Sequence, residues 1–149
     1  MRSIAPVNEP RVATNPLKVE IPASPVAGII AGQTFSCDKV TLNNGWLAFS
    51  QQGKGITPEL KATFTLNLKW GEAIGGKQII VTSQATVPSP VSIDWHDQGT
   101  FQSEFIARNY VLRLEFGTQT GKTILGKIYF ESSASHKTKF AGTFEAQVQ

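Results

Sequence analysis

The sequence SIDWHDQG, residues 92–99, contains the chain's densest group of chemically reactive side chains, with Asp94, His96 and Asp97 around Trp95. Carboxylates and imidazoles bind divalent metals and transfer protons, so this segment is the first candidate for a metal or catalytic site. In a strand, successive side chains point to opposite faces. That alternation would put Asp94 and His96 together on one face and Trp95 on the other.

A metal site needs three or four converging ligands, and Asp94 and His96 supply two. Glu104, across the turn at 97–99, or His136 could supply the third, which would predict zinc or another divalent cation and a metal-assisted hydrolase. The alternative is an ordinary strand end, in which the odd-numbered residues enter the core and the two candidate ligands face water. We favour the strand end and predict no cofactor, because the sequence confirms no third ligand.

Other catalytic motifs are absent or incomplete. The chain has two histidines, a single cysteine, Cys37, which cannot form an intrachain disulfide, and no G-x-S-x-G motif. Residues 117–123, GTQTGKT, resemble a phosphate-binding loop, but three residues rather than four separate the glycines, and a strand-like segment follows instead of a helix. We therefore expect a turn there, a structural cysteine, and no enzymatic activity.

Three tryptophans form a second candidate site, because Trp46, Trp70 and Trp95 all lie next to predicted turns. Exposed indole rings near loops can stack on sugar rings, which would predict a carbohydrate-binding surface. Burial at the ends of the core is the alternative, and we favour it.

The charge pattern argues against nucleic-acid binding. The net charge is +3, but the cations are scattered, and only Lys137 and Lys139, beside His136, approach a cluster. Phosphate recognition needs a contiguous basic patch. No apolar stretch is long enough for a transmembrane helix, and no apolar segment typical of a signal peptide follows Met1.

The remaining sequence has the two-residue period of β-strands. The alternation is clearest in residues 59–70, ELKATFTLNLKW, and it recurs in residues 109–117 and 139–149. Glycine-rich turns such as NNG at 43–45 separate about nine short segments, which predicts an all-β fold with purely antiparallel pairing. We expect a single β-sandwich over residues 26–149; the alternative is a small lipocalin-like β-barrel, since nine phenylalanines could line a cavity as well as fill a core.

The first 25 residues differ from the rest, since they hold five of the chain's eight prolines. Proline removes a backbone donor and fixes φ, so this leader should be extended and irregular. It is either a strap laid over the domain or a disordered linker.

Residues 28–49, GIIAGQTFSCDKVTLNNGWLAF, follow the pattern G-x-I-x-G-x-x-F, a spacer, and then L-x-N-G-x-L-x-F. With GKIYF at 126–130 and AGTFEA at 141–146, this pattern resembles all-β domains of exported or lipid-anchored bacterial proteins of unknown function. The resemblance implies an extracytoplasmic or cell-envelope setting and transfers no functional residue.

These observations favour a non-catalytic binding or interaction module with a protein or carbohydrate partner, whose loops or one sheet face form the contact surface. A lipocalin-like carrier of a small apolar ligand is the second hypothesis, and the metal-assisted hydrolase around Asp94 and His96 is the third. The sequence leaves the oligomeric state open.

Overall fold

The computed structural model describes residues 12, 14–53, 59–68, 72–83, 90–132 and 136–149. This part of the chain is all-β, apart from one short 3-10 helix, η2 (Pro16–Lys18). The strands are β1 (Ala27–Ile30), β2 (Gln33–Ser36), β3 (Lys39–Asn43), β4 (Trp46–Gln51), β5 (Leu60–Thr65), β6 (Gln78–Val81), β7 (Val91–Asp97), β8 (Thr100–Ile106), β9 (Tyr110–Thr120), β10 (Thr123–Ser132) and β11 (Thr138–Val148).

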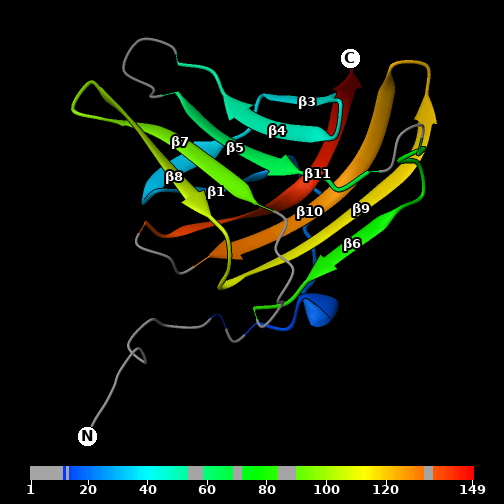
Figure 1. Ribbon diagram of the computed structural model, residues 1–149, viewed down its shortest axis with the longest axis horizontal. Coiled ribbons are helices and arrows are strands. Elements are labelled where there is room, and N and C mark those ends of the chain that lie inside the picture. Colours follow the sequence, from blue (N-terminus) through cyan, green and yellow to red (C-terminus); the bar gives the residue numbers. More distant parts are fainter. Residues whose placement is uncertain (1–11, 13, 54–58, 69–71, 84–89, 133–135) are drawn as a thin grey trace, which may run out of the picture.

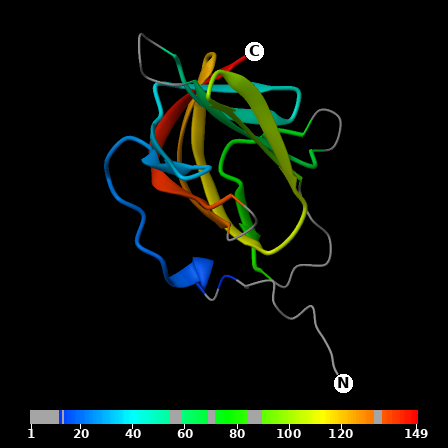
Figure 2. The ribbon, with the colours of Figure 1, turned by 90° about the vertical axis from the view of Figure 1, so that its left-hand side faces the viewer.

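The strands form one continuous sheet in the order β6-β9-β10-β11-β3-β4-β5-β7-β8, with β1 paired to β11 and to β2. This sheet curls through 225° into a half-barrel (Figures 1 and 2). The long strands β9, β10 and β11 make one side, and the shorter strands β3, β4, β5, β7 and β8 make the other.

The prediction of an antiparallel β-sandwich is wrong in two respects. The sheet is single, and β11 pairs parallel with β3, with Gln147 opposite Thr41 and Val148 opposite Leu42. Two-residue periodicity shows which side chains are buried, but a curled sheet and two stacked sheets produce the same alternation. Parallel neighbours also need no helical crossover when, as here, they come from distant parts of the chain. The lipocalin-like alternative describes the curl but not a closed barrel, because β6 and β8, at the two ends of the strand order, do not pair with each other in the described residues.

The inside of the half-barrel is filled by aromatic rings. The ring of Phe49 lies 5.0 Å from Phe144 and 5.7 Å from Phe64, both at edge-to-face angles of 90°. Phe64 in turn lies 5.2 Å from Phe130, and Phe130 lies 5.4 Å from Phe140. Such offset and edge-to-face pairs add to the stabilisation from apolar burial. In the described residues the interior is therefore a packed core.

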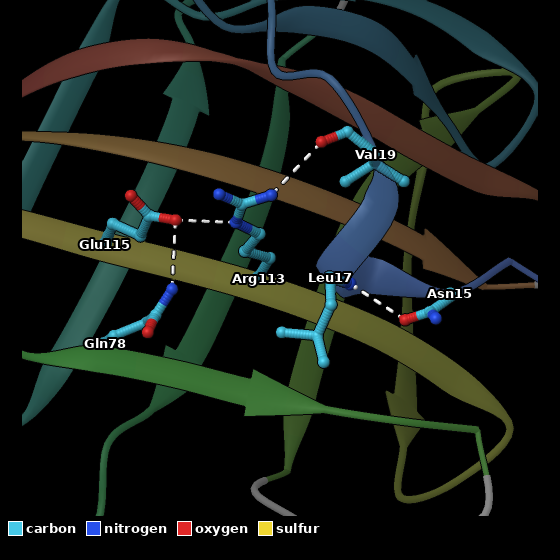
Figure 3. A network of polar contacts seen from close by, with 6 residues as sticks. All are labelled: Asn15, Leu17, Val19, Gln78, Arg113 and Glu115. Atoms are coloured by element: carbon cyan, nitrogen blue, oxygen red, sulfur yellow. Dashed lines mark hydrogen bonds and ion pairs between the residues drawn. The ribbon is translucent and has the colours of Figure 1, made fainter.

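The N-terminal segment 14–26, which we call the strap, runs along the outer face of β9, β10 and β11 (Figure 2). Near its start lies η2, where the side chain of Asn15 accepts a hydrogen bond from the Leu17 backbone at 3.0 Å (Figure 3). A small apolar cluster holds the N-terminal segment on the sheet, formed by Val12, Val19 and Ile21 with Val111, Tyr129 and Ala141. Residues 1–11 and 13 of the predicted leader lie outside the described residues.

Candidate binding groove

A hollow on the outer face of the sheet lies where β11 changes its neighbour. The strand pairs with β1 over residues 139–141 and with β3 at residues 147 and 148. Between these stretches, Thr143 donates its backbone N–H to the Ser24 carbonyl of the strap at 2.8 Å. A sheet that divides in this way leaves a depression between the separating segments.

The groove at this division has a volume of about 890 Å³, which lies within the range of roughly 300–1,000 Å³ typical of small-molecule sites. Its floor consists of β9, β10 and β11, and its walls are the end of the strap and the segment leading into β3. The lining residues are Pro25, Val26, Cys37, Asp38, Lys39, Val40, Glu115, Phe116, Gly117, Leu125, Gly126, Lys127, Thr143, Phe144, Glu145 and Gln147.

Glycines shape this region. Gly117 has no side chain, so nothing projects from β9 into the groove at this position. A side chain at Gly126 would collide with the ring of Phe144, which fills the core beneath it. At Gly142, an added Cβ would lie 2.6 Å from the Ser24 carbonyl, so only glycine allows the strap to approach β11 this closely.

The floor combines an apolar centre with charges of both signs. Leu125 is 63% exposed although it is aliphatic, and it lies opposite Glu145 in the register of β10 and β11. Lys127, two residues along β10, lies opposite Thr143 on β11 and opposite Glu115 on β9. An apolar surface between a carboxylate and an ammonium group suits an amphipathic ligand.

Glu115 is held in its charged form at the edge of the groove. Its Oε2 accepts a hydrogen bond from Arg113 Nε at 2.6 Å and another from Gln78 Nε2 at 3.1 Å (Figure 3). The hydrogen bond from Arg113 is the main cause that lowers the pKa of the Glu115 carboxyl, and it outweighs the opposing effect of burial. Arg113 also donates to the Val19 carbonyl of the strap at 3.1 Å, so this network joins the sheet, the strap and the groove.

Cys37 lies in the groove wall as a neutral thiol. Burial is the main cause that raises its pKa to about 11, and its Sγ donates a hydrogen bond to the Lys39 carbonyl at 3.4 Å. A thiol with this pKa is almost fully protonated at neutral pH, and only the thiolate is a good nucleophile.

Residues 92–99 form β7 from its second residue onward and the turn that leads into β8. The strand prediction is confirmed, since Val91, Ile93 and Trp95 are buried while Asp94 and His96 lie half-buried on the outer face.

Asp94 and His96 border a second, smaller depression on the outer face. The Asp94 carboxylate accepts a hydrogen bond from Ser103 Oγ at 2.7 Å, and the His96 ring lies 5.6 Å from the Phe101 ring. The depression measures about 200 Å³, and its lining residues are Glu59, Lys61, Asp94, Trp95, His96 and Phe101.

The structure separates the third proposed ligand from this pair. Glu104 lies opposite Ile93 in the hairpin and therefore belongs to the inner face. Its Oε1 lies 3.2 Å from His136 Nδ1, and the His136 ring lies 4.7 Å from the Trp95 ring. Within the described residues, no three His, Cys, Asp or Glu side chains are placed to hold one metal ion.

Of the two tryptophans that the structure describes, Trp46 and Trp95, only the first is exposed. Trp46 is 61% exposed at the start of β4, whereas Trp95 is 6% exposed and faces inward. Trp70 lies outside the described residues. The groove was not predicted from the sequence, although Leu125 gave a signal: it is an aliphatic residue on the polar side of the alternating segment Thr123–Ser132.

Comparison with protein families, with curated proteins and with solved structures finds no match to this chain. In the described ranges, no helix has the length and apolar character required to span a membrane.

Proposed function

We propose that the protein is a non-catalytic binding module that takes a small amphipathic ligand in the groove between the strap, β3 and the β9–β11 floor. The observation that carries the proposal is the exposed Leu125 side chain, set between Glu145 and Lys127 in a hollow of small-molecule size. A ligand with an apolar body and polar ends would cover Leu125 and exchange polar contacts with the flanking charges.

The chemistry of the groove favours binding over catalysis. Cys37 has a raised pKa and is a poor nucleophile at neutral pH, and the Glu115 carboxylate is engaged by Arg113 and Gln78. Both groups are thereby kept in one protonation state near neutral pH, whereas proton transfer favours a group whose pKa lies near the working pH.

The groove also revises the carrier hypothesis. The interior of the half-barrel is filled by the aromatic core, so a carried ligand would lie on the outer face of the sheet and not inside it. A setting outside the cytoplasm stays a prediction from the sequence resemblance.

A fragment screen by ligand-observed NMR, with amphipathic compounds, tests the proposal. Leu125→Trp fills the centre of the groove, and Leu17→Trp is its matched control, because Leu17 is 62% exposed on the strap and is not one of the groove's lining residues. We expect Leu125→Trp to weaken binding of the hits at least tenfold and Leu17→Trp to leave it unchanged. Equal effects of the two variants, or no hits at all, would overturn the proposal.

A further inference from the structure

Strand β8 forms one end of the sheet, and no strand in the described ranges pairs with its outer edge (Figure 1). Its sequence is TFQSEFI, and its two rings, Phe101 and Phe105, are 59% and 68% exposed. An unpaired edge with exposed rings is a hazard for a monomer, because both the main chain and the apolar surface can pair with another strand.

The turn between β7 and β8 fixes the hydrogen-bond pattern of the hairpin. Gln98 and Gly99 have φ angles of 53° and 82°, as in the two-residue turns that suit twisted strands. The flanking pair, Asp97 and Thr100, therefore exchanges backbone hydrogen bonds, and such pairs recur at every second position.

This alternation identifies the backbone groups at the free edge of β8. Phe101, Ser103 and Phe105 turn their N–H and C=O groups away from β7. The neighbouring strand β7 supports this pattern. The His96 carbonyl, opposite Phe101, points away from β8 and accepts a hydrogen bond from Gln33 Nε2 at 3.1 Å.

The edge of β8 lacks the features that usually prevent strand pairing. It contains no lysine, no proline and no bulge, and its register with β7 is continuous from Thr100 to Ile106. Its single charged residue, Glu104, lies on the inner face beside His136, so it places no charge next to the exposed rings on the outer face.

Residues 101–105 read F-Q-S-E-F, which is nearly the same in both directions. We propose that β8 pairs antiparallel with β8 of a second copy of this chain, about a two-fold axis at Ser103, so that two half-barrels share one continuous sheet. This interface is separate from the groove and does not depend on the proposed ligand.

The proposed register pairs residues of the same type and places no two like charges opposite each other. Ser103 faces Ser103 of the second copy, and Phe101 faces Phe105 of the second copy twice across the axis. The residues in these pairs have the free backbone groups, so each pair exchanges two hydrogen bonds across the interface. Their side chains lie on the outer face, where the rings of the two copies cover each other. Gln102 faces Glu104 of the second copy, whereas an axis at Glu104 would oppose two carboxylates. A two-fold contact of this kind closes on itself and stops at a dimer.

Sedimentation velocity of the full chain over a concentration series measures the association. We expect a reversible species with twice the mass of the 16.2 kDa chain, growing with concentration. A monomer at every concentration up to the millimolar range would overturn the proposal.

Two double variants test the register. Phe101→Glu with Phe105→Glu puts like charges opposite each other across the axis, whereas Phe101→Glu with Phe105→Lys puts opposite charges there. Both remove the same rings from exposed positions, so a matching thermal melt shows that both fold. We expect the Glu/Lys pair to dimerise roughly tenfold more tightly than the Glu/Glu pair. Equal association of the two variants would contradict the register.

Cross-linking locates the axis directly. Residues opposite each other in a hydrogen-bonded antiparallel pair have Cα atoms about 5.5 Å apart, which a disulfide can span. Ser103→Cys should therefore give a covalent dimer under mild oxidation, and Thr100→Cys, near the far end of the strand, should not. The reverse pattern would contradict an axis at Ser103.

Discussion

Arg113 ties the strap to the sheet through a single side chain: its Nε donates to Glu115 at 2.6 Å, and its Nη1 donates to the Val19 carbonyl at 3.1 Å (Figure 3). Glu115 is also a residue of the groove. The position of the strap, which forms one wall of the groove, therefore depends on an ion pair at the edge of the floor.

Removing this side chain should loosen the strap. Arg113→Ala deletes one charge-assisted hydrogen bond and the bond to Val19, so we expect the free energy of unfolding to fall by about 1–2 kcal/mol, since the pair is partly exposed to water. Amide exchange in the strap should rise. Arg108→Ala, at an exposed position, is the control and should change stability by less than about 0.5 kcal/mol. Equal exchange rates in the two variants would show that Arg113 does not hold the strap.

The same ion pair predicts a dependence of stability on acid. The pKa of Glu115 is lowered in the folded state, so its contribution is complete above the unfolded value of 4.5 and is lost as pH falls through the folded pKa. Urea unfolding at pH 7 and at a series of pH values below 4.5 should show this loss in the wild type. In Glu115→Gln the corresponding part of the pH dependence should disappear; an unchanged profile would contradict the assignment.

Tyr129 predicts a loss of stability in alkali. Burial is the main cause that raises its pKa from 10.0 to about 12, and its hydroxyl also donates to Glu131 at 2.7 Å. The unfolded state releases this proton first, so stability should fall as pH rises from about 10 towards about 12. Tyr129→Phe should remove this fall. A spectroscopic titration of the wild type that gave two ordinary tyrosine pKa values would contradict it.

The close approach of the strap to β11 predicts an unequal cost for two glycine substitutions. Gly142→Ala puts a Cβ against the Ser24 carbonyl and should destabilise the fold by about 3 kcal/mol. Gly121→Ala, in open space at the β9–β10 turn with a φ of 62°, carries backbone strain alone and should cost about 1 kcal/mol. Thermal or urea unfolding measures the loss of stability in both variants. An equal loss would mean that the strap moves away at Ser24 to make room for the added Cβ, which would contradict the close approach.

Local patterns in the sequence predict the elements of this protein well. Alternation places Asp94 and His96 on one face of β7 and Trp95 on the other, as the structure has them. It does not by itself place Glu104, which depends on the register across the turn. A two-residue turn pairs Asp94 with Ser103, so Glu104 must lie on the opposite face.

Features made by distant segments could not be predicted in this way. The parallel pairing of β11 with β3 joins the two ends of the domain, and nothing local encodes it. The same pairing turns two expected sheets into one curled sheet and opens the groove where β11 changes neighbours. Leu125, exposed on a strand of otherwise regular alternation, is the only trace of that groove which we recognise in the sequence.

The most direct test of the proposed function is an amide chemical-shift map of the wild-type protein during titration with its best amphipathic fragment. We expect saturable shifts that cluster at Gly117, Leu125, Lys127 and Glu145 and at the segment leading into β3. Shifts centred on Trp46 or on the β7–β8 hairpin, with the groove amides unmoved, would contradict it.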